Sequence, residues 1–137
     1  MSKSFFIDTS VCTACRGCQV ACKQWHDLPA EETRNQGTFQ NPPDLSFQTY
    51  KLVRMKEEVI DGELRWLFLP EQCRHCIEPP CLQTADDEEA IYKDEKTGAV
   101  IFTANTKNLD ANEIIEACPY NIPRKAAAGT LTKCDMC

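Results

Sequence analysis

The chain has 137 residues, a formal net charge of −6 and ten cysteines. This length fits one compact domain or two small halves. The acidic balance argues against a nucleic acid partner, because phosphate recognition needs a basic surface. No apolar run reaches the length of about 18 residues that a membrane-spanning helix needs, so we expect no transmembrane segment.

The high cysteine content has two readings, a disulfide framework or a set of metal ligands. A short chain with few large aliphatic residues needs cross-links of one kind or the other. Its first residues lack the apolar segment of a secretory signal peptide, and no twin-arginine pair is present. We therefore expect reduced cysteines that bind metal.

In chain order, residues 4–8 predict a short strand that leads into the first cysteine motif. The motif contains Cys12, Cys15, Cys18 and Cys22 at spacings of three, three and four. This C-x2-C-x2-C-x3-C run is typical of a [4Fe–4S] cluster, and in two-cluster ferredoxins its fourth cysteine binds the other cluster. It therefore predicts a second, distant set of ligands.

A helix is predicted from about residue 16 to residue 27, with Trp25 on the same stripe as the cysteines. For Trp25 we favour packing in the core over a role as an electron relay. Residues 29–46 form a polar loop, which at this length is functional or packed on a partner. Residues 47–59 and 63–69 then predict two strands joined by a turn at Asp61-Gly62. We assign this hairpin a structural role, as a cover for the cluster region or a docking surface.

The second motif contains Cys73, Cys76 and Cys81. The position where a fourth ligand would follow is Ala85, so this stretch supplies three thiolates to one cluster and none to a neighbour. His75, inside the first pair, is interpreted as a loop residue rather than a ligand.

An acidic run at 86–89 is either a solvated loop or a docking face for a basic redox partner. Residues 90–93 and 99–102 predict a hairpin, and residues 110–117 a short helix.

Cys118 ends a motif whose earlier ligand positions are Asn108, Ala111 and Ile114. It therefore lacks three companions, while the second motif lacks a fourth ligand. We predict that one complete [4Fe–4S] set consists of Cys73, Cys76, Cys81 and Cys118.

The last motif, Cys134 and Cys137, opens a ligand run with no further cysteine. Two other sets are then one thiolate short, so we expect a chain truncated at its C-terminus. These incomplete sets are Cys12, Cys15 and Cys18 for the first cluster, and Cys22, Cys134 and Cys137 for the third.

The order of these motifs resembles the ferredoxin-type electron-transfer subunits of molybdopterin oxidoreductases. Within that group the chain is similar to the beta subunits of periplasmic formate dehydrogenases from sulfate-reducing bacteria, over nearly its whole length. The resemblance is carried by CRGCQVACKQWH at 15–26, TYKLVRM at 49–55, CRHC at 73–76, CPY at 118–120 and KCDMC at 133–137.

The resemblance implies an α+β fold with tandem ferredoxin-like halves, an inserted β-hairpin and loops. The first, incomplete half would combine residues 1–28 with 119–137, residues 29–70 would be the insertion, and residues 71–118 the second half with one cluster lost. Three [4Fe–4S] clusters are implied for the complete subunit.

The same resemblance implies a non-catalytic subunit. A large subunit with a tungsten or molybdenum bis-pterin site would oxidise formate, and this chain would pass the electrons to an acceptor such as a c-type cytochrome. A periplasmic location is implied, with export on the signal of the large partner.

Three alternatives compete with this interpretation. The same role beside another molybdopterin oxidoreductase remains open, and so does an iron–sulfur regulatory sensor, although no DNA-binding or effector-binding segment is visible. A zinc-binding structural module would use the paired cysteines but leaves the 12–22 run unexplained. As a further hypothesis, Lys23, Arg74 and Lys133 lie next to ligands in the sequence and raise the potential of the nearest cluster.

Overall fold

The computed structural model describes residues 3–137, which divide into two compact units. One unit contains residues 6–71, and the other contains residues 72–137 together with 3–5. This division differs from the predicted one, because residues 119–137 share a unit with 72–118. The pairing of the two chain ends in one ferredoxin-like half stays a prediction.

The unit of residues 6–71, called the N-terminal unit below, begins without the predicted strand. Residues 4–8 have no regular structure, and the 3-10 turn η1 (Thr9–Val11) follows. The Asp8 carboxylate caps this turn by accepting a hydrogen bond of 2.9 Å from the Ser10 N–H. Local bonds of this kind compete with strand pairing, so the expectation of a strand at 4–8 is wrong.

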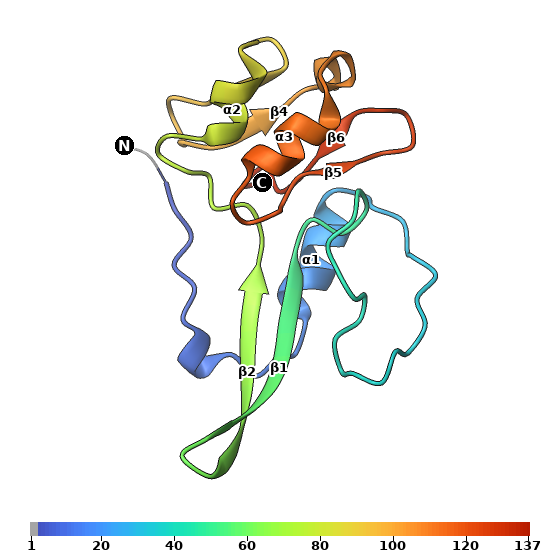
Figure 1. The fold of residues 1–137 in the computed structure, drawn as a ribbon, viewed down its shortest axis with the longest axis vertical. Helices are drawn as coiled ribbons and strands as arrows, with labels where there is room; N and C mark the ends of the chain where they lie inside the picture. The colour runs from blue at the N-terminus through green and yellow to red at the C-terminus, as the bar shows by residue number, and fades with distance from the viewer. Residues whose placement is uncertain (1–2) are drawn as a thin grey trace. The chain divides into compact units, whose positions relative to one another are not determined.

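Two long strands form the centre of the N-terminal unit, β1 (Leu52–Ile60) and β2 (Glu63–Glu71). They pair antiparallel and run side by side as an extended hairpin in Figure 1. The turn residues Asp61 and Gly62 have φ of 53° and 80°, the left-handed pair that a two-residue hairpin turn requires. The predicted hairpin is confirmed, with β1 starting later than expected.

Helix α1 (Gly17–Trp25) confirms the predicted helix. Its buried Gln19 fixes it to the hairpin, because the side-chain oxygen accepts a hydrogen bond of 3.4 Å from the Val53 N–H. Trp25, predicted to lie in the core, is instead 71% exposed. The apolar side chains of this helix are therefore a poor guide to its buried face.

The other unit, called the C-terminal unit below, is built from short elements. Two small antiparallel sheets pair β3 with β4 and β5 with β6. Helix α2 packs against α3 and against β3. The elements are α2 (Pro80–Ala85), β3 (Ile91–Lys93), β4 (Val100–Phe102), η2 (Ala104–Asn108), α3 (Ala111–Ala117), β5 (Arg124–Lys125) and β6 (Leu131–Thr132).

The predicted hairpin at 90–102 and helix at 110–117 are confirmed by β3, β4 and α3. Helix α2 was not predicted; Pro80 starts it, at a position where proline needs no N–H. The core of the unit joins Cys81 of α2 to Ile91, Val100, Ile114 and Leu131. A cysteine therefore lies within the hydrophobic core itself. Across residues 3–137, no helix combines the length and apolar character needed to cross a membrane.

Candidate metal centre

Three of the four C-x2-C loops, at 12–15, 73–76 and 134–137, have a left-handed residue at the same position. In these three loops it is the residue before the second cysteine, with φ of 54° at Ala14, 47° at His75 and 78° at Met136. This turn directs backbone N–H groups toward the preceding sulfur: the His75 N–H donates to the Cys73 thiol at 3.4 Å. Concave N–H arrangements of this kind are common around Fe–S sites.

The four cysteines of the predicted complete set line one cavity in the C-terminal unit. About 360 Å³ of space not filled by protein atoms, open solvent included, lies between the residues that line it. Its wall combines prolines from the ligand loops with Val100, Ile122 and Lys133. The structure thus brings together Cys73, Cys76, Cys81 and Cys118.

Burial and mutual proximity set the protonation of these thiols. Burial is the main cause of a rise in the pKa of Cys81 to about 11; Lys133 opposes this rise, and the neighbouring Cys73 and Cys118 contribute to it. Burial likewise raises the pKa of Cys134, and nearby Cys73 adds to this rise. Bound iron reverses this preference, because a coordinating thiol is deprotonated.

His75 provides a test of whether a sulfur-rich group fits this region. Its side chain is 8% exposed, and Nδ1 accepts a hydrogen bond of 3.0 Å from the Val100 N–H. Nε2 therefore carries the proton in the neutral ring, and burial lowers the pKa of His75 to about 4. Within residues 3–137 this buried Nε2 has no hydrogen-bond partner. A donor without an acceptor is costly to bury, so the region fits an added acceptor such as cluster sulfur.

The ligand loop of the first predicted cluster lies in the N-terminal unit. Cys12 is half-buried, whereas Cys15 and Cys18 are exposed. Gly17 lies close to the ligands, since a Cβ added there would be 3.6 Å from the Cys15 sulfur. Cys12 and Cys15 lie on the loop before α1, and Cys18 lies in the first turn of the helix.

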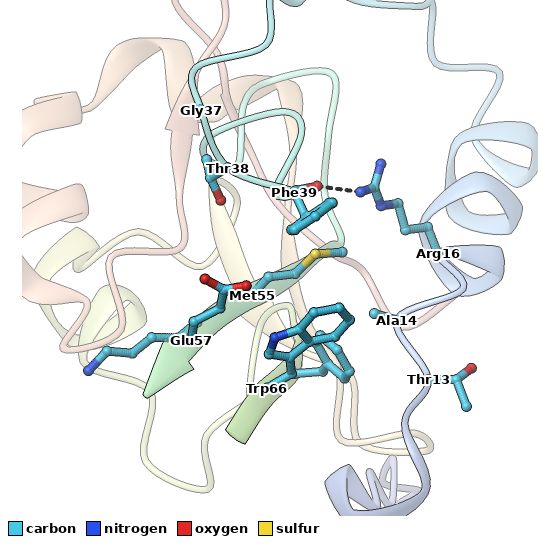
Figure 2. A pocket seen from close by; sticks show the side chains of 11 residues that line it. Thr13, Ala14, Arg16, Gly37, Thr38, Phe39, Met55, Glu57 and Trp66 are labelled. Atoms are coloured by element: carbon cyan, nitrogen blue, oxygen red, sulfur yellow. Dashed lines mark hydrogen bonds between the residues drawn. The ribbon is translucent and has the colours of Figure 1, made fainter. Parts of the chain in front are cut away.

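A cavity adjoins this first ligand loop. Figure 2 shows Ala14 and Arg16 on one side and Met55 and Trp66 of the hairpin on the other. The Arg16 guanidinium donates to the backbone carbonyl of Phe39, as the dashed line in Figure 2 marks. Arg16 thereby attaches the long loop to the ligand loop, and the Phe39 ring stacks near Trp66 at a centroid distance of 5.9 Å.

The predicted third set is distributed between the units. Cys22 lies on α1, one turn after Cys18, while Cys134 is buried and Cys137 exposed in the C-terminal unit. Whether these three thiols share one cluster stays a prediction.

Two residues have a larger place in the site than the sequence interpretation gave them. His75 was interpreted as a loop residue, yet it is buried and bonded to β4. Lys133 was one of three equivalent cations, yet it alone lines the cavity with a buried side chain. In the sequence, both residues stand out only because each lies next to a cysteine. That position does not indicate whether the side chain is buried.

Comparison with known proteins identifies the family. The family described as the 4Fe-4S dicluster domain matches residues 64–137. The chain is 62% identical to the formate dehydrogenase subunit beta of Megalodesulfovibrio gigas and 52% identical to the formate dehydrogenase 2 subunit beta (cytochrome c-553) of Nitratidesulfovibrio vulgaris. Both matches cover 100% of this chain and 66% of the relative, so the chain spans slightly less than two thirds of their length.

A more distant relative is a probable anaerobic dimethyl sulfoxide reductase chain of Escherichia coli, 30% identical over 97% of this chain and 60% of that protein. The resemblance to formate dehydrogenase beta subunits is confirmed, and so is the expectation of [4Fe–4S] clusters as the cofactor. The chain belongs to the 4Fe-4S dicluster domain family.

Proposed function

We propose that this chain is the electron-transfer subunit of a formate dehydrogenase. Electrons from formate oxidation in a tungsten- or molybdenum-pterin subunit would pass through it to an external acceptor such as a c-type cytochrome. The observation that carries the proposal is the convergence of four cysteines on one cavity, in a chain 62% identical to a formate dehydrogenase beta subunit. No catalytic residue is assigned to this chain.

The ligand sets proposed for the clusters follow the spacing of the motifs. The enclosed set in the C-terminal unit would hold the second cluster, the loop before α1 the first, and the remaining three cysteines the third. A bound [4Fe–4S] cluster supplies a carrier that accepts and releases one electron at a time. The proposed ligands are, for the first cluster, Cys12, Cys15 and Cys18; for the second, Cys73, Cys76, Cys81 and Cys118; and for the third, Cys22, Cys134 and Cys137.

The protein's own groups would control this carrier in three ways. The buried Cys81 would lose its proton on ligation, which makes cluster assembly in this unit proton-coupled. The His75 backbone N–H, already bonded to the Cys73 sulfur, would withdraw charge from that ligand. The proline and valine walls would exclude water and lower the local dielectric.

The proposed location and acceptor are supported by the name of one relative. One relative has cytochrome c-553 in its name, which supports a c-type cytochrome as the acceptor and the periplasm as the compartment. A second candidate is the same role beside another molybdopterin oxidoreductase. The similarity to a probable dimethyl sulfoxide reductase chain favours it specifically, although the identity is about half as high.

The test purifies the chain anaerobically with its natural partner. We expect iron and acid-labile sulfide in equal amounts, a broad visible absorbance that dithionite bleaches, and formate-dependent dye reduction by the complex. Reduction of dimethyl sulfoxide without formate oxidation would favour the second candidate. A colourless protein with bound zinc would contradict both.

A further inference from the structure

Lys133 is a buried cation in the wall of the enclosed cysteine cavity. Its residue is 6% exposed, and its side chain lines the same cavity as the four cysteines. The ammonium donates to the carbonyl of Val100 and, at 2.9 Å, to that of Cys134. It also lies 4.7 Å from the centroid of the Phe102 ring. Carbonyls and a ring solvate the charge without neutralising it.

No carboxylate within residues 3–137 forms an ion pair with this ammonium; its recorded contacts are the two carbonyls and the ring. Lysine is almost never fully buried unless it is paired, because desolvation of the charge is expensive. The cavity that Lys133 lines is where a negative charge could lie close to its ammonium. Thiolates that hold iron there would carry net negative charge.

The two other cations considered from the sequence differ from Lys133. Lys23 lies 3.8 Å from the carboxylate of Glu31 and so has its own counter-ion. Arg74 also lines the cysteine cavity, but its residue is exposed and its guanidinium lies over the Tyr120 ring at 5.5 Å. Solvent screens an exposed charge, whereas a buried charge acts at a low effective dielectric. Of the three cations that lie beside cysteines in the sequence, Lys133 is therefore the one that is buried without an anionic contact.

We propose that Lys133 is the internal counter-cation of the [4Fe–4S] cluster held by Cys73, Cys76, Cys81 and Cys118, and that it raises the reduction potential of this cluster. The inference rests on the proposed ligand set. Reduction adds one negative charge to the cluster, and a fixed cation in the wall stabilises the more negative state by more than the oxidised state. Cluster net charge and nearby charge are among the determinants of these potentials.

The test measures midpoint potentials of the full chain in complex by EPR-monitored redox titration. K133Q keeps hydrogen-bond donors but removes the charge, and K133R keeps the charge. We expect K133Q to make one cluster about tenfold harder to reduce, a shift of about 59 mV to more negative potential for a one-electron couple. K133R should stay close to the parent. The matched control is K107Q, which removes an exposed lysine of the same unit and should shift nothing.

A second measurement separates charge from packing. Without iron, the buried ammonium has no counter-charge, so K133Q should be at least as stable to heat as the parent. With iron bound, K133Q should be less stable than the parent. A purely structural role for the lysine would weaken both forms alike. If K133Q does not assemble, K133M replaces it in the same measurements. Loss of iron from K133Q and K133M, with iron retained in K133R, would support the role of Lys133 as counter-cation.

Unchanged potentials in K133Q with full iron content would overturn the proposal, as would an equal shift in K133R. The outcome is independent of the proposed function. Formate-driven reduction of the parent complex establishes the subunit's role, whichever way the Lys133 variants behave. A parent chain that binds no iron would instead remove the ligand set and this proposal with it.

Discussion

The enclosed cysteine set and the loop before α1 use the same C-x2-C spacing but meet different surroundings. In the C-terminal unit, Cys81 is part of the hydrophobic core and is 9% exposed. In the N-terminal unit, Cys15 on the loop and Cys18 in the first turn of α1 are both exposed. The backbone of the two loops is alike, with left-handed residues at Ala14 and His75. The two loops therefore share a local turn, while the packing around each determines how far its cysteines are buried.

This difference has consequences for electron transfer. Solvent exposure and hydrogen bonds to sulfur are among the main determinants of cluster potential. Buried groups of the protein, Lys133 and His75 among them, surround the enclosed set. The loop before α1 is open to water and to any partner that covers it. We expect the protein itself to control the potential of the enclosed cluster more strongly.

The largest expected effect comes from removing one ligand in each region. C81A should eliminate the EPR signal of the enclosed cluster and lower the melting temperature of the C-terminal unit, because it removes both a ligand and a core side chain. C15A should eliminate only the signal of the first cluster. Iron content should fall by one cluster's share in each variant.

If C15A destabilised the chain as much as C81A, the contrast between the two regions would be wrong. Retention of all EPR signals in C81A would remove this residue from the proposed ligand set.

The second effect concerns the iron-free protein at alkaline pH. Burial raises the Cys81 pKa from the ordinary 9.0 to about 11, so the folded state holds this proton more tightly than the unfolded state. The resulting stability is complete below pH 9 and is lost as pH rises toward 11. Denaturant unfolding of the iron-free chain at several pH values should show the decline.

C81A should flatten this decline, whereas C15A should leave it in place. Iron-loaded protein should lack this contribution, because a ligated thiolate has no proton to lose. A decline of equal size in iron-free C81A would assign the effect to other groups.

The smallest effect concerns the shared loop conformation. Ala14 has a φ of 54°, which a β-branched residue tolerates poorly, so A14V should cost about 1 to 3 kcal/mol of loop stability and reduce occupancy of the first cluster. A14G should retain the cluster, since glycine adopts this conformation without strain. Iron content and the EPR signal of the first cluster report both variants. Equal loss of the first cluster in A14G and A14V would show that the cluster depends on the methyl group of Ala14 and not on the backbone conformation.

Local chemistry made part of the structure predictable from sequence. Asp61-Gly62 specifies a left-handed turn, and the hairpin around it follows. Cysteine spacing grouped Cys118 with the second motif, and these four cysteines line one cavity. That they bind one cluster stays a prediction.

Features that depend on tertiary packing were not predictable. The apolar stripe placed Trp25 in the core, yet α1 buries Gln19 instead, through its bond to β1. Residues 4–8 have strand-like composition but gain no strand partner within the described chain. Lys133 and Lys23 both lie next to a cysteine in the sequence, and only packing shows that one is buried against carbonyls.

The central claim is that electrons from formate reach the clusters of this chain. The most direct measurement adds formate anaerobically to the purified complex and records EPR spectra of rapidly frozen samples. The account predicts reduced [4Fe–4S] signals from this chain, with the signal of the enclosed cluster missing in a complex that carries C118A. Clusters that dithionite reduces but formate leaves oxidised, in a complex that still oxidises formate with an artificial dye, would contradict it.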